Sequence, residues 1–164
     1  VVPAFAQVKK RYPDTRLVIV GEGSLRVKMQ RQAQEFDCTD NVEWAGRQLQ
    51  ERLMEWYRRM DIVLMPSRSE GFGLTAIEAM ANGCVVVASR TGGLPEVVQD
   101  GEVGLLHKVG SIDDMANKII SLIATPELLQ KYSSKAIRYV RRYSFERYSQ
   151  LFNDLYKRLI TTKR

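Results

Sequence analysis

The chain has 164 residues, of which 45% are hydrophobic and 27% are charged, and this balance suits one soluble globular domain rather than a disordered chain. No apolar run is long enough to span a bilayer, and the first residues do not resemble a signal peptide. The formal net charge is +6 and there are only two cysteines, Cys38 and Cys84, which argues against a disulfide framework and favours a reduced, cytoplasmic setting.

The first part of the chain predicts a helix, a strand and a turn. Residues 1–12 carry apolar side chains at helical spacing, and the helix should end before Pro13, because a residue that precedes proline avoids helical backbone angles. Residues 17–20 form a continuous apolar run, which is typical of a parallel strand covered on both faces. Residues 21–24 lack a full GxGxxG pattern, so we interpret them as a turn in which Ser24 caps the next helix.

Helices and strands then alternate. Apolar spacing predicts a helix over 25–36, a strand over 42–45, a helix over 49–60 and a strand over 62–65. In the helix over 49–60 the apolar residues at helical spacing are predicted to be buried in the core, and they are Leu49, Leu53, Trp56 and Met60. This alternation predicts a doubly wound, Rossmann-like parallel sheet. A strand is expected before the first helix of such a sheet, and the chain contains none there.

Residues 67–83 are the most informative stretch, a glycine-containing loop followed by a helix. Gly71 and Gly73 let backbone N–H groups approach a ligand closely. A helix that begins near Gly73 directs its free N–H groups and the positive end of its dipole to the same place. The stretch therefore predicts an anion site, most naturally for phosphate.

Two carboxylates accompany this predicted anion site. Glu70 lies in the loop, and Glu78 lies in about the second turn of the helix. A carboxylate repels phosphate, so the expected partners of both side chains are hydroxyl groups. Hydroxyl groups on both sides of a phosphate indicate a nucleotide sugar.

The rest of the chain predicts one more strand-end loop at the same edge and then a helical C-terminal part. The loop 89–93 follows the apolar strand 84–88, and ligands bind beside such strand ends in open α/β folds. A short helix and a strand over 103–107 come next, and helices in 111–164 are expected to pack on the domain, the last of them capped by Ser144.

Basic side chains gather toward the C-terminal end of the sequence. They are Arg138, Arg141, Arg142, Arg147, Lys157, Arg158, Lys163 and Arg164. A solvated helical face is the plainest interpretation, and attraction to an anionic membrane surface is the functional one. Nucleic acid is a third option, but no base-stacking motif accompanies the charge.

Taken together, these motifs resemble the C-terminal, donor-binding domain of a retaining glycosyltransferase with the two-domain GT-B architecture. The E-x7-E pair is the signature of that family, and here it stands in order with the glycines, the following strand and a Gly-Gly-Leu-Pro-Glu loop. The matching residues are Glu70-Gly71-Phe72-Gly73-Leu74, Glu78-Ala79-Met80-Ala81, Gly83, Val85-Val86-Val87-Ala88, Thr91-Gly92-Gly93-Leu94-Pro95-Glu96, Asp100-Gly101 and Gly104-Leu105-Leu106.

The resemblance implies a role for each residue of the motif. Glu78 would accept hydrogen bonds from the ribose hydroxyls of the sugar donor, and Glu70, the candidate catalytic residue, would contact the transferred sugar. Gly71, Phe72 and Gly73 would offer N–H groups to that sugar, and Leu74 and Thr75 to the diphosphate.

Two arginines have weaker assignments. Arg68 would contact a phosphate or the acceptor, although a surface role is the plainer interpretation. Arg47 stands at a strand end where this family often contacts the nucleobase.

No cofactor and no metal ion are expected. His107 is the lone histidine, so it supports neither a metal cluster nor a nucleophilic triad. In the family, basic side chains and the helix N-terminus counter the charge of the diphosphate. The expected partners are a nucleotide sugar, a saccharide or lipid-linked acceptor, the N-terminal domain of the same protein and, as an option, the inner face of an anionic membrane.

The chain departs from the family at its start. The donor domain of such enzymes usually opens with a strand that ends in Gly-Arg and is followed by a lysine, and neither basic residue is found here. This departure predicts a fragment that lacks the acceptor domain and does not transfer sugar alone. An inactive nucleotide-sugar-binding or interaction module remains an alternative. A dinucleotide-dependent oxidoreductase domain fits less well, because GxGxxG and the ribose-binding acid about 20 residues further on are absent.

Overall fold

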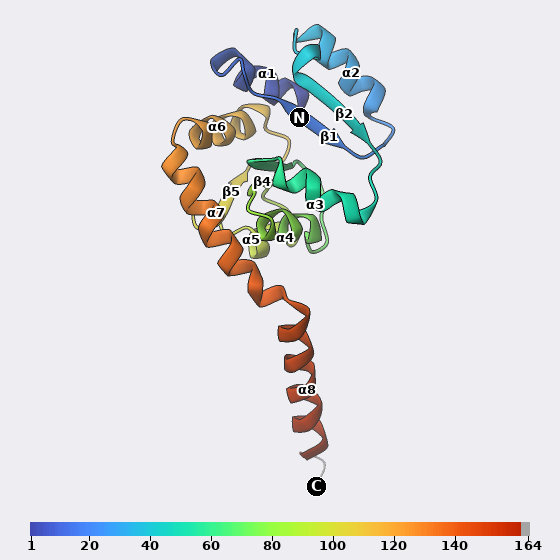
Figure 1. The fold of residues 1–164 in the computed structure, drawn as a ribbon, viewed down its shortest axis with the longest axis vertical. Helices are drawn as coiled ribbons and strands as arrows, with labels where there is room; N and C mark the ends of the chain where they lie inside the picture. Colours follow the sequence, from blue (N-terminus) through green and yellow to red (C-terminus); the bar gives the residue numbers. More distant parts are fainter. Residues whose placement is uncertain (162–164) are drawn as a thin grey trace.

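The computed structural model describes residues 1–161 as an α/β fold with a long helix that extends from it (Figure 1). Helices and strands alternate along most of the chain. In order they are α1 Val2–Arg11, β1 Leu17–Val20, α2 Arg26–Glu35, β2 Val42–Gly46, α3 Gln50–Arg58, β3 Ile62–Met65, α4 Leu74–Ala81, β4 Val85–Ser89, α5 Leu94–Val97, β5 Gly104–His107, α6 Ile112–Ile123, α7 Pro126–Val140 and α8 Phe145–Thr161, with short 3-10 turns η1 Thr39–Asn41 and η2 Arg141–Tyr143.

The strands are parallel, as predicted, but they form two sheets. β1 pairs with β2, and β3, β4 and β5 form a three-stranded sheet in that order. Within residues 1–161 no strand ladder joins β1 to β3. A doubly wound sheet of six strands has the order 3-2-1-4-5-6. If β1 to β5 are strands two to six, the interruption falls where the first strand of that order would lie.

The three-stranded sheet is covered on both faces. Alternate residues of β3 and β4, such as Val63 and Val86, pack on one face against α3, α4 and α5. The other face, with Val85 and Val87, packs against α6 and the start of α7. All five residues of β4 are buried, which explains why this strand reads as a continuous apolar run rather than an alternating one.

The helices after β5 differ in their packing. α6 and α7 bury apolar side chains such as Leu122 and Ala136 against the sheet. α8 buries no residue and extends away from the rest of the chain (Figure 1). The expectation that residues 111–164 pack on the domain is therefore wrong for α8. Lys163 and Arg164 lie outside the described residues.

Two local predictions are also corrected. Ser24 does not cap α2, which begins at Arg26 after Leu25 with no side-chain cap. Leu49, predicted to lie in the core, is 71% exposed, because the helix starts only after it and the buried face of α3 runs through Leu53 and Tyr57 instead. Ser144 does cap α8, since its Oγ accepts a hydrogen bond from the Arg147 N–H at 3.3 Å. No helix within residues 1–161 is both long and apolar enough to cross a membrane.

Candidate functional site

The candidate site is built around the N-terminus of α4. Gly73 precedes this helix with a φ of +91°, a left-handed conformation that glycine adopts without strain, and no side chain caps the helix. The first intrahelical acceptor is the carbonyl of Gly73, to which Ala76 and Ile77 donate. Helical geometry therefore leaves the N–H groups of Leu74 and Thr75 free for an external anion.

A second strand-end loop closes against the loop that precedes α4. The N–H of Gly93 donates to the carbonyl of Gly71 at 3.1 Å, and the hydroxyl of Thr91 donates to the carbonyl of Arg68 at 3.2 Å. A Cβ added to Gly92 would lie 1.8 Å from the Glu70 carbonyl oxygen. The Gly-Gly pair is therefore required by the close contact between two backbones, and it holds the carboxylate-bearing loop in place.

Glu70 lies half-buried in this loop. Its carboxylate accepts a hydrogen bond from the hydroxyl of Ser67 at 3.4 Å. The neighbouring Phe72 is 44% exposed, and its ring contacts the ring of Tyr143 edge-on at a centroid distance of 5.7 Å. Glu70 thus has one weak local partner, and the loop around it remains open.

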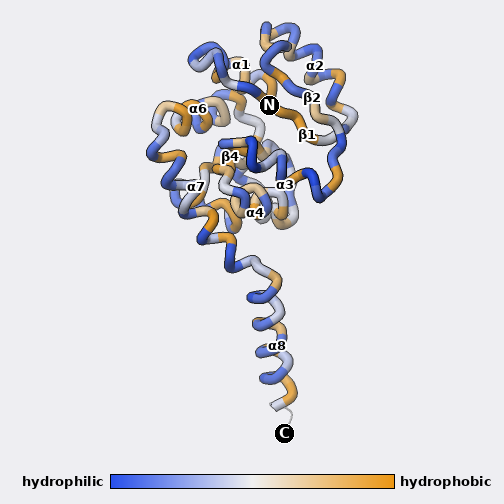
Figure 2. The backbone as a smooth tube through the Cα atoms, viewed as in Figure 1, coloured by the Kyte–Doolittle hydropathy of each residue, from blue (hydrophilic) through white to orange (hydrophobic). Residues whose placement is uncertain are grey.

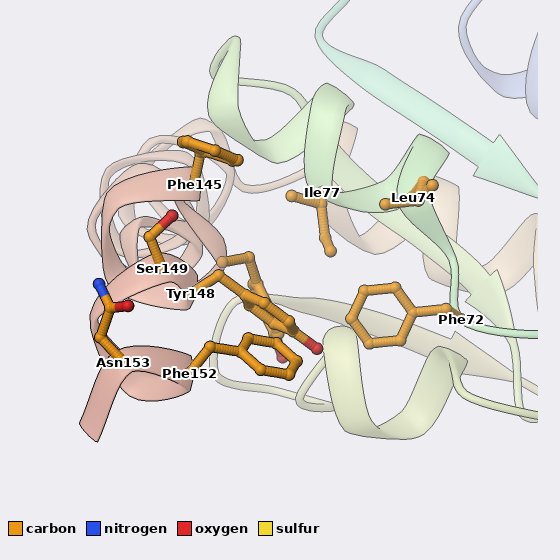
Figure 3. Close-up of a pocket in the computed structure, with 9 residues that line it drawn as sticks. Phe72, Leu74, Ile77, Phe145, Tyr148, Ser149, Phe152 and Asn153 are labelled. Carbon is orange, nitrogen blue, oxygen red and sulfur yellow. The ribbon is translucent and has the colours of Figure 1, made fainter. Parts of the chain in front are cut away.

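An open, mainly apolar groove of about 820 Å³ lies between this loop and the start of α8 (Figure 3). Phe72, Leu74 and Ile77 line one side of it, and the other side comes from η2 and α8. In Figure 3 the side chains of Tyr148 and Phe152 lie opposite Phe72. The residues lining the groove are Phe72, Leu74, Ile77, Tyr143, Phe145, Tyr148, Ser149, Phe152 and Asn153.

Glu78 is the more firmly held carboxylate. Its Oε1 accepts a hydrogen bond from Gln50 Nε2 at 2.9 Å, and its Oε2 accepts one from the Tyr57 hydroxyl at 3.2 Å. Burial, and the charge of Glu78 beside it, raise the pKa of Tyr57 to about 12, so this hydroxyl stays protonated and donates. The side chain of Glu78 is therefore tied to α3 rather than free in solvent.

The predicted arginines lie at the rim of the site. Arg68 is exposed in the loop after β3, and Arg47 is exposed in the short segment between β2 and α3, three residues before Gln50. The structure brings Arg68, Glu70, Gly71, Phe72, Gly73, Leu74 and Thr75 together in one loop and helix start. It connects Glu78 to this group through α4, whereas no hydrogen bond, ion pair or ring contact joins the Arg47 side chain to any of these described residues.

Sequence reasoning missed Gln50 and Tyr57, the two partners of Glu78. Helical spacing alone assigned Trp56 to the buried stripe of α3, and the neighbouring Tyr57 is in fact the buried residue, at 8% exposure. A tyrosine next to such a stripe indicates a buried hydroxyl that needs a partner. The pattern cannot say which partner that is.

The described residues contain no group of three or more His, Cys, Asp or Glu side chains placed to hold a metal ion. His107 is buried, with its Nε2 3.4 Å from the Ser89 hydroxyl and its Nδ1 3.0 Å from the Lys108 carbonyl oxygen. Both ring nitrogens thus have partners, one at the end of β4 and one just after β5, as a structural role requires.

Comparison with known proteins points to one family. The family model described as glycosyl transferases group 1 matches residues 1–139. Among curated relatives, D-inositol 3-phosphate glycosyltransferase of Segniliparus rotundus is 37% identical over 87% of this chain and 33% of its own length. N-acetyl-alpha-D-glucosaminyl L-malate synthase of Bacillus anthracis is 33% identical over 83% of this chain and 35% of its own. The chain thus spans about a third of the length of these relatives.

Solved structures agree with the family match. Sucrose-phosphate synthase of Thermosynechococcus elongatus superposes over 98% of this chain and 42% of its own, with a TM-score of 0.82 and 28% identity. HepE of Anabaena, solved in complex with UDP, superposes over 95% of this chain and 44% of its own, with a TM-score of 0.83 and 25% identity. The C-terminal domain of a group 1 glycosyl transferase from Francisella tularensis superposes over 88% of this chain and 77% of its own, with a TM-score of 0.80 and 28% identity. The chain therefore belongs to the glycosyl transferases group 1 family and has the C-terminal, Rossmann-like fold of GT-B glycosyltransferases.

Proposed function

We propose that this chain binds the nucleoside-diphosphate-sugar donor in a transfer of a sugar to a saccharide or lipid-linked acceptor, with retention of the anomeric configuration. The observation that carries the proposal is the uncapped N-terminus of α4, which follows Glu70 in the loop and precedes Glu78 on the same helix. Free N–H groups suit a diphosphate, and carboxylates suit the hydroxyls on either side of it. HepE, part of which superposes on this chain, is solved in complex with UDP, and this supports a nucleotide as the ligand.

The proposed contacts follow the loop and helix in order. The N–H groups of Gly71, Phe72 and Gly73 face the transferred sugar, and the Glu70 carboxylate accepts hydrogen bonds from the hydroxyls of that sugar. Leu74 and Thr75 bind the diphosphate, and Glu78 binds the ribose. Arg68 contacts a phosphate or the acceptor, and Arg47 contacts the nucleobase.

The chemistry is a substitution at the anomeric carbon. The bond from this carbon to the diphosphate oxygen breaks, and the nucleoside diphosphate leaves with the electron pair. The oxygen of an acceptor hydroxyl forms the new bond, and its proton passes to the leaving diphosphate. Positive charge builds on the sugar and negative charge on the leaving group, so N–H groups aimed at the diphosphate stabilise the transition state. The two glutamates hold the sugar donor in position rather than attack it.

Transfer also requires an acceptor held next to the anomeric carbon. Because the relatives named above are about three times as long as the matched region, we propose that the remainder of such a protein binds the acceptor. We expect the 164-residue chain alone to bind the sugar donor weakly and to give no turnover.

Isothermal titration calorimetry of the chain with UDP, GDP and NAD tests the proposal. We expect UDP or GDP to bind, NAD not to bind, and a chelator to leave the affinity unchanged. Glu78→Ala should weaken binding by about 1.5–3 kcal/mol, because a hydrogen bond to a charged group is lost. The matched control Glu35→Ala alters an exposed glutamate at the end of α2 and should change nothing. Preferential binding of NAD, or full affinity in Glu78→Ala with the fold intact, contradicts the assignment.

A further inference from the structure

The carboxylate of Glu78 is held on both oxygens by α3. Gln50 Nε2 donates to Oε1 at 2.9 Å, and the Tyr57 hydroxyl donates to Oε2 at 3.2 Å. Gln50 is exposed, whereas Tyr57 is buried in the same apolar cluster as Ala79 and Met80 of α4. Tyr57 is therefore the rigid partner of the pair, because packing holds its ring.

The backbone of Tyr57 is itself hydrogen-bonded to Cys84, the residue just before β4. The thiol of Cys84, which is fully buried, donates to the carbonyl of Tyr57 at 3.1 Å and lies 3.3 Å from the carbonyl oxygen of Met60. Burial raises the pKa of Cys84 to about 11, so the thiol keeps its proton and acts as the donor. The end of α3 is thus joined to α4 at Glu78 and to the segment just after α4 at Cys84.

Two hydrogen bonds do not occupy all the acceptor sites of the Glu78 carboxylate. Its two oxygens offer about four lone-pair sites, so about one site on each oxygen remains after Gln50 and Tyr57 are bound. Two remaining acceptor sites on neighbouring oxygens fit two neighbouring hydroxyls. A ribose presents such a pair, and a 2′-deoxyribose lacks one member of it.

We infer that Tyr57, assisted by Gln50, is a positioning residue that orients the Glu78 carboxylate for the two hydroxyls of a ribose and so makes this site selective for ribonucleotides. The inference rests on the proposed function, because it assumes that a nucleotide binds at the N-terminus of α4. Tyr57 has no contact with the nucleotide in this account. It acts only through Glu78.

The test compares the affinities of ribo- and deoxyribonucleotides in variants of the chain. Calorimetry is run with UDP and GDP and with their 2′-deoxy counterparts. We expect the unchanged chain to favour the ribonucleotide by about tenfold. In Tyr57→Phe the affinity for the ribonucleotide should fall to within about threefold of that for the deoxy form, while the deoxy affinity barely changes. Gln50→Ala should reduce the preference by a smaller factor.

A merely structural role for Tyr57 gives a different result. If the Tyr57–Glu78 hydrogen bond only stabilises the packing of α3 on α4, its loss would lower the affinity for both nucleotides equally and leave their ratio unchanged. That result overturns the inference, while the proposed function stands. Tyr132→Phe is the matched control, because Tyr132 is buried on the other face of the sheet. If Tyr57→Phe does not fold, as judged by circular dichroism, the exposed Gln50→Ala decides, and an unchanged ribose preference there overturns the inference. If neither UDP nor GDP binds the unchanged chain, both the inference and the proposed function fall.

Discussion

Gly92 shows how a single residue sets the geometry of the candidate site. Its φ is +52°, and a Cβ there would overlap the Glu70 carbonyl oxygen at 1.8 Å. Gly92→Ala therefore combines a left-handed backbone, which costs about 1–2 kcal/mol for an L-residue, with a clash that displaces the Glu70 loop. We expect the affinity for UDP or GDP to fall on the order of tenfold, since small displacements of a binding loop are costly.

Gly101→Ala is the control that separates strain from the clash. Gly101 has a φ of +75°, but a Cβ there meets no atom within 4 Å. Thermal unfolding should show a loss of stability in both variants, and the loss should be larger in Gly92→Ala because of the clash. Calorimetry should show weakened binding only in Gly92→Ala. Equal affinities in the two variants would mean that contact between the two loops is irrelevant to the ligand.

Among the elements, α8 shows that an amphipathic pattern does not determine where a helix packs. Apolar and polar stretches alternate along it (Figure 2), as they do on a helix with one buried face. Even so, Phe145 is 83% exposed and Ile160 is 73% exposed. The helix also lies beyond residues 1–139, which match the family model.

Removing α8 should therefore leave the domain intact. We expect a chain that ends at Ser144 to lose less than about 1 kcal/mol of unfolding free energy, so Tm should fall by less than about 2–4 °C for a protein of this size. It should bind a hydrophobic dye less than the full chain does, because the exposed stripe is gone. Differential scanning calorimetry measures the shift. A loss of cooperative unfolding would show that α8 stabilises the domain.

At the scale of the whole molecule, the interruption between the two sheets leaves strand edges unpaired. Val18 and Ile19 of β1 and Leu64 of β3 are only half-buried, whereas β4 is buried throughout. A strand edge with free N–H and C=O groups is a template for pairing with another chain. We infer that the isolated chain associates with itself through these edges.

Analytical ultracentrifugation over a range of protein concentrations checks this prediction. We expect the weight-average mass to rise with concentration, and Val18→Lys to reduce that rise, because a charged side chain on an edge strand disfavours further pairing. Leu17 and Ile19 pack in an apolar core cluster to which Val18 does not belong, so the fold should tolerate the change. A purely monomeric chain at all concentrations would contradict the prediction.

Much of the fold could be predicted from the sequence because its signals are local. Continuous apolar runs such as 85–88 specify buried parallel strands, and helical spacing specifies the helices between them. The helix start after Gly73 follows from glycine at a position that needs a left-handed backbone. These properties depend only on residues close in sequence, so the sequence by itself determined the element order and the loop that carries Glu70.

The remaining features depend on contacts between distant residues, which only the tertiary structure decided. The split between β1 and β3, the exposure of α8 and the Gly92 contact with Glu70 each depend on which segments meet in space. The same holds for the hydrogen bond from the Tyr57 hydroxyl to Glu78, which lies 21 residues away in the sequence. A hydrogen bond has short range and strict geometry, so no periodicity along the chain encodes which side chain will complete it.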